Sequence, residues 1–124
     1  MVALKRNDFP PDDLRRLGAL IAKTFNMSPD CEFSVEIDPR RLTEDHVRAL
    51  QESGATRASL GVQDFDPDVQ QAVHRLQPQE MSEQVIAWIR ETGFTSLNVD
   101  LMYGLPRQTL ASFEKTLDRI IELA

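Results

Sequence analysis

Three short segments that alternate apolar and polar residues constrain the fold most. Residues 31–38, 56–63 and 95–102 each show this alternation, and helical patterns precede the first segment and follow each of the three. Because successive side chains of a strand point to opposite faces, each predicted strand has one apolar and one polar face. Strands that alternate with helices favour a parallel sheet joined by right-handed crossovers. We therefore predict an α/β fold, with a parallel sheet of three βα units.

The helices are predicted from their apolar spacing and from residues typical of helix ends. Thr43, Asp66 and Ser82 are the expected N-caps, and Gly54 and Gly93 are expected to end two of the helices. The predicted helices cover residues 12–25, 44–53, 67–73, 83–92 and 110 onward.

The polar faces of the strands carry the information about function. A parallel sheet covered on both faces has nearly continuous apolar strands, whereas each strand here has a polar face. The alternation alone leaves two interpretations open: this face holds a polar ligand inside an open barrel or groove, or it only meets solvent. Glu36, Gln63 and Asp100 lie at or near the carboxyl ends of their strands, where parallel α/β folds place their ligand sites. Their placement favours a ligand site.

Composition and charge exclude several classes of function. A hydrophobic content of 41% fits one globular domain over residues 1–124, and a net charge of −6 argues against nucleic-acid binding. No apolar run approaches the ~20 residues of a membrane span, and the first residues lack the pattern of a signal peptide. The single cysteine, Cys31, excludes an internal disulfide and any cluster or zinc site built from this chain's thiolates alone. We expect a cytoplasmic protein without nucleic-acid or membrane partners.

Four segments together resemble the middle of the oxygen-independent coproporphyrinogen III oxidases, which are radical S-adenosylmethionine (SAM) enzymes. The resemblance covers residues 11–124 in order and without gaps, whereas residues 1–10 do not match. His74 stands where the family usually has asparagine. The four segments are EIDPR (36–40), GVQDFDP (61–67), VHRLQ (73–77) and NVDLMYGLP (98–106).

The resemblance implies a partial TIM-type barrel that binds SAM and a [4Fe-4S] cluster. In that family a radical derived from SAM takes hydrogen from propionates of coproporphyrinogen III, which lose carbon dioxide and become vinyl groups in anaerobic haem biosynthesis. By the same resemblance, Glu36 contacts one SAM molecule, and Gln63, Arg75 and Asp100 contact a second. Carboxylates accept hydrogen bonds from ribose hydroxyls or an ammonium group, the amide both donates and accepts, and the guanidinium binds a carboxylate. No catalytic or metal-ligating residue of this chain is implied.

Each of these four residues also has a purely structural interpretation. Glu36 could be a solvated acid at a strand end, and Asp100 could cap the turn that follows it. Gln63 could satisfy loop backbone, and Arg75 could be a surface residue that pairs with Asp66 or Asp68. For Tyr103, as for the single tryptophan, packing is expected rather than stacking on a ligand.

The chain also departs from the family. It has no CxxxCxxC motif for the cluster and no glycine-rich strand end for the methionine part of SAM. We therefore expect an internal piece of a radical SAM enzyme that is inactive by itself. Unpaired edges of a sheet invite pairing with another chain. We expect either self-association through the open edges or an element over residues 1–8 that shields one of them.

Two other functions stay open. A related family of haem-binding chaperones shares much of this region, although the EIDP (36–39) and QDF (63–65) strings are closer to the oxidases. A haem titration separates the two, because a haem carrier gives a saturable Soret shift. The remaining alternative is a stable domain without a ligand.

Overall fold

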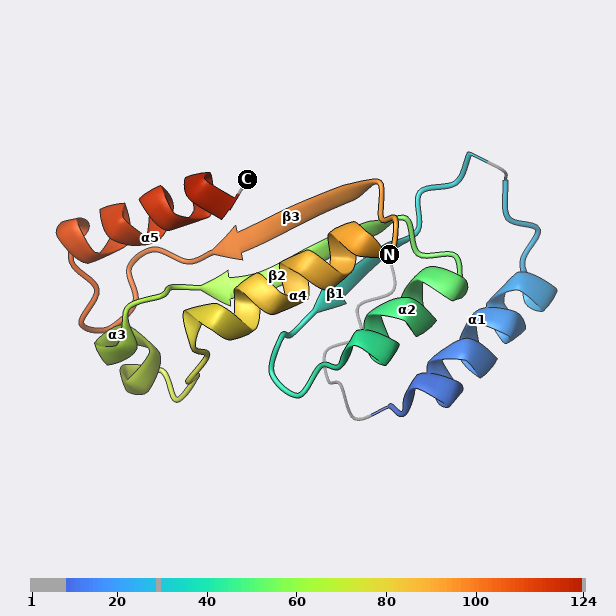
Figure 1. Cartoon of the computed structure of the whole chain (residues 1–124), viewed down its shortest axis with the longest axis horizontal. Coiled ribbons are helices and arrows are strands. Elements are labelled where there is room, and N and C mark those ends of the chain that lie inside the picture. The colour runs from blue at the N-terminus through green and yellow to red at the C-terminus, as the bar shows by residue number, and fades with distance from the viewer. Residues whose placement is uncertain (1–8, 29, 124) are drawn as a thin grey trace.

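The computed structural model describes residues 9–28 and 30–123. The predicted element over residues 1–8 lies outside these residues. After the first helix, each strand is followed by one helix or, after the second strand, by two (Figure 1). The elements are α1 (Pro11–Thr24), β1 (Ser34–Ile37), α2 (Glu44–Glu52), β2 (Arg57–Gln63), α3 (Pro67–Ala72), α4 (Gln79–Glu91), β3 (Ser96–Leu101) and α5 (Leu110–Leu123).

The three strands form one parallel sheet in the order β1-β2-β3. Ile37 of β1 and Val99 of β3 both pair with Leu60 of the central strand. The predicted α/β fold with a parallel sheet is therefore confirmed. All three carboxyl ends lie at the same end of the molecule, where the arrowheads point in Figure 1.

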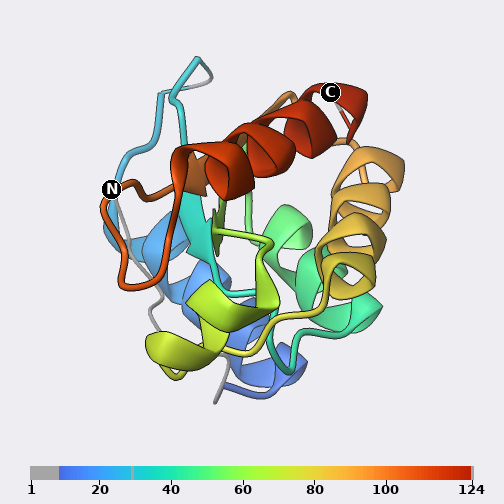
Figure 2. The ribbon, with the colours of Figure 1, turned by 90° about the vertical axis from the view of Figure 1, so that its left-hand side faces the viewer.

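The apolar face of the sheet forms the core, as the alternation predicts. Val35, Ile37, Leu60 and Val62 are buried. Helices α2 and α4 lie on the same side of the sheet (Figure 2) and bury their own apolar residues in the same cluster. Their buried apolar residues are Val47, Ala49, Leu50, Val85, Ile86 and Ile89. The opposite, polar face is left for the side chains described below.

Two of the three expected N-caps are confirmed. The Thr43 hydroxyl accepts from the His46 backbone N–H, and the Asp66 carboxylate accepts from the N–H groups of residues 68 and 69. The cap expected at Ser82 is wrong, because α4 begins at Gln79 and Pro78 is its N-cap residue. Ser82 is buried and its hydroxyl accepts from Gln77 Nε2 at 2.9 Å. The hydroxyl therefore satisfies a buried amide instead of a helix end.

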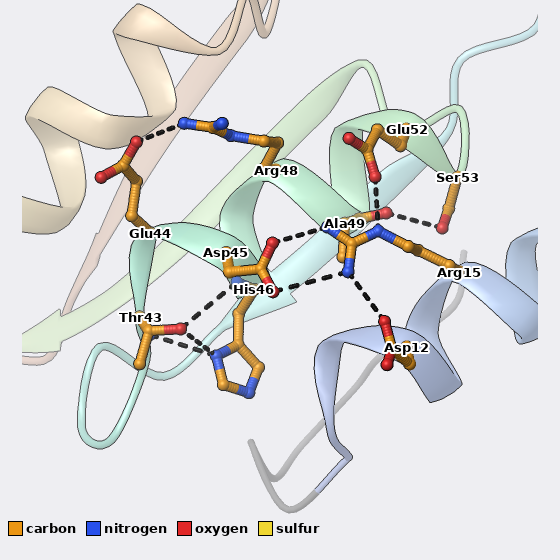
Figure 3. Close-up of polar contacts among 10 residues, drawn as sticks. All are labelled: Asp12, Arg15, Thr43, Glu44, Asp45, His46, Arg48, Ala49, Glu52 and Ser53. Atoms are coloured by element: carbon orange, nitrogen blue, oxygen red, sulfur yellow. Dashed lines mark hydrogen bonds and ion pairs between the residues drawn. The ribbon is translucent and has the colours of Figure 1, made fainter.

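Helix α1 packs on α2 at a very close approach. A Cβ built on Gly18 would lie 2.4 Å from the Cβ of Ser53, so only glycine fits there. Beside this contact Arg15 donates to Asp45 and to Glu52, each at 2.6 Å (Figure 3). Hydrogen bonds to these two carboxylates raise the pKa of Arg15, and the hydrogen bond from Arg15 lowers the pKa of Asp45. This exposed network orients α1 along α2.

The residues that adopt a left-handed backbone differ between the two ends of the sheet. Among the described residues, every non-glycine with positive φ lies at or after the carboxyl end of a strand; these are Arg41, Gln63, His74 and Arg107. The turns at the amino ends of β2 and β3 instead use Gly54 and Gly93. His74, with φ of 54°, has a conformation that asparagine and histidine adopt more readily than most residues. This explains why histidine can stand where the resembling family usually has asparagine.

Strand β3 ends the sheet on one side. A hollow of about 570 Å³ lies between this strand, α4 and the end of α5, and Leu97, Val99, Ile120 and Leu123 are among its lining residues. Self-association through the sheet edges stays a prediction, as does the single domain over residues 1–124. Within the described ranges, none of the helices is long and apolar enough to cross a membrane.

Candidate functional site

The four predicted site residues line one pocket. Glu36, Gln63, Arg75 and Asp100 surround a space of about 260 Å³ on the polar face, at the carboxyl ends of the strands. The other lining residues are Ile37, Asp38, Ser59 and Gly61. The structure therefore brings together four side chains that come from three strands and from the loop after α3.

A β-bulge gives Gln63 its place in this pocket. Gly61 pairs with Asp100 and Gln63 pairs with Leu101, so that β2 has one more residue than β3 at this point. The extra residue, Val62, is buried in the core, and Gln63 has a left-handed φ of 70°. Strict alternation places Gln63 on the polar face, but it does not predict the bulge or the strained backbone that hold the side chain there.

Gly61 leaves room for two of the polar side chains. A Cβ built on Gly61 would lie 3.1 Å from Gln63 Nε2 and 3.3 Å from Arg75 Nη2. Arg75 Nη2 donates to the Gly61 carbonyl at 3.0 Å. The Gln63 amide and the Arg75 guanidinium therefore lie against the backbone of β2 at Gly61, where no side chain separates them from it.

Arg75 is held by Asp38 and keeps one donor unused. Its Nη1 donates to Asp38 Oδ2 at 3.1 Å, and Arg40 also pairs with this carboxylate. The structural interpretation in which Arg75 pairs with the aspartates at 66 and 68 is therefore wrong. Arg75 Nε is buried and has no hydrogen-bond partner in the structure. A buried donor without a partner is costly, so this atom indicates where an acceptor of a ligand would fit.

Asp100 faces the pocket and accepts from the Ser59 hydroxyl at 2.7 Å. The turn after β3 is closed by Gln108, whose Oε1 accepts from the backbone N–H of Gly104 at 2.7 Å. Asp100 therefore lines the pocket and does not cap the turn, which is closed by Gln108. The second carboxylate, Glu36, lies half-buried on the neighbouring strand.

Sequence reasoning missed two polar residues of the pocket. Asp38 and Ser59 share the polar face with Glu36 by the same alternation, which was the signal that could have found them. The packing expected for Tyr103 is wrong, because its side chain is 85% exposed in the loop after β3. Trp88 does pack against the core.

The charge of Asp38 is stabilised in the folded state. Burial alone would raise its pKa, but hydrogen bonds from Arg40 and the positive charges of Arg75 and Arg40 outweigh this effect. The pKa of Asp38 therefore lies below its ordinary value of 3.8.

We expect this carboxylate to contribute stability that depends on pH. Because its pKa is lower in the folded than in the unfolded chain, the contribution is complete above about pH 4 and is lost as the pH falls through the folded-state pKa. Urea unfolding of the wild type and of Asp38→Asn, measured from pH 7 to pH 2, tests this. The wild type should lose more stability on acidification, by at most about 1.4 kcal/mol per pH unit, and the two curves should converge at low pH. Parallel curves would contradict the prediction.

The described residues do not fit a metal centre. Over residues 9–28 and 30–123, no three histidine, cysteine, aspartate or glutamate side chains gather in a group that could hold a metal ion. Cys31 is the only cysteine of the chain and is half-buried. His46 serves the helix cap, where its Nδ1 accepts from the Thr43 N–H at 3.2 Å (Figure 3).

Comparison with protein families gives one matching model, described as the radical SAM superfamily, over residues 7–120. Curated relatives include the oxygen-independent coproporphyrinogen III oxidase of Helicobacter pylori strain J99, which is 46% identical over 116 residues. The enzyme of the same name from Escherichia coli K12 is 44% identical over 110 residues. The aligned parts cover 93% and 89% of this chain but only 25% and 24% of those proteins. The chain thus spans about a quarter of their length.

Solved structures agree on the fold. The coproporphyrinogen III oxidase of Escherichia coli, described as a radical SAM enzyme, superimposes with a TM-score of 0.88 and 42% identity, over 94% of this chain and 27% of that one. The radical SAM methyltransferase TsrM of Kitasatospora setae, with cobalamin and a [4Fe-4S] cluster bound, gives a TM-score of 0.72 over 91% of this chain and 22% of that one. At 18% identity the second match supports the fold alone.

Proposed function

Because this chain belongs to the radical SAM superfamily, we propose that its polar pocket binds S-adenosylmethionine. We further propose that the chain is the central part of an oxygen-independent coproporphyrinogen III oxidase, acting on a porphyrinogen in the cytoplasm. The observation that carries the proposal is that Glu36, Gln63, Arg75 and Asp100 line one pocket.

The chemistry of the pocket fits parts of SAM. Glu36 and Asp100 offer carboxylate oxygens to ribose hydroxyls or to the ammonium group, and Gln63 both donates and accepts. The unused Nε of Arg75 offers a donor to the SAM carboxylate. A volume of about 260 Å³ is slightly below the range of ligand pockets, which span roughly 300–1,000 Å³. The pocket therefore holds part of the ligand, and other segments of a longer protein would contact the rest.

The residues of this chain do not fit the iron–sulfur cluster. Such clusters are held by several cysteine thiolates, and Cys31 is the only cysteine here. We propose that the cluster ligands lie outside these 124 residues. When bound beside a reduced cluster, SAM supplies the radical chemistry of the superfamily. The part of this chain is to bind and orient SAM.

Titration of ¹⁵N-labelled chain with SAM, followed by NMR, tests the binding site. We expect weak binding, with a Kd of about 1 mM or higher, because most contacts of the ligand are missing and each hydrogen bond to a charged group contributes only about 1.5–3 kcal/mol. The amides of Gly61, Gln63 and Asp100 should shift, because they border the pocket.

Two single variants with the same charge change distinguish specific binding from a general charge effect. Asp100→Asn should abolish the shifts at about 5 mM SAM, a few times the expected Kd. Asp118→Asn on the exposed part of α5 should retain them. Shifts that survive in Asp100→Asn would contradict the proposed site. A micromolar Kd would contradict the conclusion that segments outside this chain supply most of the contacts.

A further inference from the structure

A buried carboxylate lies directly beside the pocket without entering it. Asp64 follows Gln63 in the chain and is 1% exposed, and it is not among the residues that line the pocket. Its Oδ1 accepts from the Thr116 hydroxyl at 2.7 Å and from the backbone N–H of Asp66 at 2.8 Å. Its Oδ2 accepts from Gln108 Nε2 at 2.5 Å. A carboxylate only accepts hydrogen bonds, so these three donors match its chemistry.

Gln108 joins this carboxylate to the loop after β3. Its Nε2 also donates to the Met102 carbonyl at 2.9 Å, and its Oε1 accepts from the N–H groups of Gly104 and Leu105. One side chain therefore closes the loop over residues 102–108 on itself and ties it to the end of β2. Flipping the amide would break the bonds to both N–H groups, so its orientation is determined.

Two further hydrogen bonds confine the backbone at Gln63. Its carbonyl accepts from the Met102 N–H at 2.9 Å, and Gln70 Nε2 donates to the next carbonyl, that of Asp64, at 2.9 Å. The carbonyls of Gln63 and of the residue after it are thus both anchored, and Gln63 has a left-handed conformation that a side-chain-bearing residue adopts only when its surroundings impose it.

We propose that Asp64 and Gln108 form a positioning pair, which holds the loop after β3 against β2 and so aims the Gln63 side chain into the pocket. The functional role rests on the proposed SAM site, but the positioning itself does not. Neither residue touches the ligand space, so both act through Gln63.

A swap of the donor and the acceptor tests the pair. In Asp64→Asn, the new amide NH₂ group at position 64 faces the NH₂ group of Gln108, so two donors meet. In Gln108→Glu, a carboxylate oxygen at position 108 faces the Asp64 carboxylate, so two acceptors meet. The double variant restores one donor and one acceptor between positions 64 and 108, while the carbonyl oxygen of the new amide at position 64 still accepts from Thr116 and Asp66. It does not restore the bond to the Met102 carbonyl, because a carboxylate at position 108 has no hydrogen to donate. The readouts, taken without any ligand, are the NMR resonances of the Gln63 side-chain amide and of the buried Arg75 Nε–H. Both side chains lie against Gly61.

We expect each single variant to shift both resonances and to abolish the SAM-induced shifts at a fixed SAM concentration. The double variant should return both resonances most of the way toward their wild-type positions, with a smaller displacement left by the lost bond to Met102. Gln108→Ala, which adds no charge, repeats the test if Gln108→Glu does not fold. A purely structural role would lower the unfolding midpoint but leave the two resonances unchanged in the single variants, and that result would overturn the proposal.

A folded double variant whose two resonances stay displaced as far as in the single variants would also overturn it. If the wild type shows no SAM-induced shifts while both resonances still follow the swap, the positioning pair stands and the proposed function falls.

Discussion

We expect Leu60→Ala to lower the free energy of unfolding by about 3 kcal/mol, the largest effect of any change considered for this chain. Leu60 is 0% exposed and lies in the middle of the central strand, with Ile37 and Val99 as its register partners. Removing its branched end takes away buried apolar surface and leaves a cavity that neighbours on both sides cannot fill. Equilibrium unfolding in urea at pH 7 measures the loss.

Leu110→Ala is the matched control, because it makes the same chemical change where the side chain is 77% exposed, at the start of α5. We expect this variant to stay within about 0.5 kcal/mol of the wild type. Equal losses in the two variants would contradict the core described for the apolar face.

We expect Gly18→Ala to destabilise the chain by about 2 kcal/mol. The new Cβ would lie 2.4 Å from Ser53 Cβ and 2.8 Å from Ser53 Cα, so α1 would have to move away from α2. Overpacking of this kind costs about 1–3 kcal/mol or more, and the close approach of backbone places this case at the upper end. The higher helix propensity of alanine offsets about 1 kcal/mol.

Two further variants separate the clash from helix propensity. Ala22→Gly, at an exposed position of α1, should lose only the propensity difference of about 1 kcal/mol. Ser53→Gly removes two of the three atoms in the clash, so the double variant with Gly18→Ala should regain part of the loss. If Gly18→Ala proves more stable than the wild type, the close contact of the two helices does not exist in solution.

The strands and the buried face of the sheet were predictable, because the alternation of apolar and polar residues shows which side chains are buried. Val35, Ile37 and Leu60 share one parity, and a parallel sheet covered by helices on that side buries them together. The start of α4 was not predictable in this way. Ser82 has the chemistry of an N-cap, but the buried side chain of Gln77, just before the true N-cap residue Pro78, donates to the same hydroxyl. The capping preference of Ser82 gave way to a hydrogen bond inside the buried start of the helix.

For the pocket, local sequence predicted which residues come together, but it did not predict their partners. Parallel strands place Glu36 and Asp100 at one end with the same parity, and this required only the strand assignments. The pairing of Arg75 with Asp38 joins residues 37 positions apart, and the bulge before Gln63 depends on the register with β3. Such features are set by tertiary packing, which residue spacing does not encode.

The uneven use of left-handed backbone has a consequence for engineering the chain. A side-chain-bearing residue in this conformation costs about 1 kcal/mol or more, whereas glycine adopts it freely. Glycine at positions 41, 74 and 107 is therefore a direct route to a more heat-resistant protein. These positions also surround the end of the sheet that carries the pocket. None of these three side chains lines the pocket, so we expect the glycine variants to gain stability while the lining of the pocket stays unchanged.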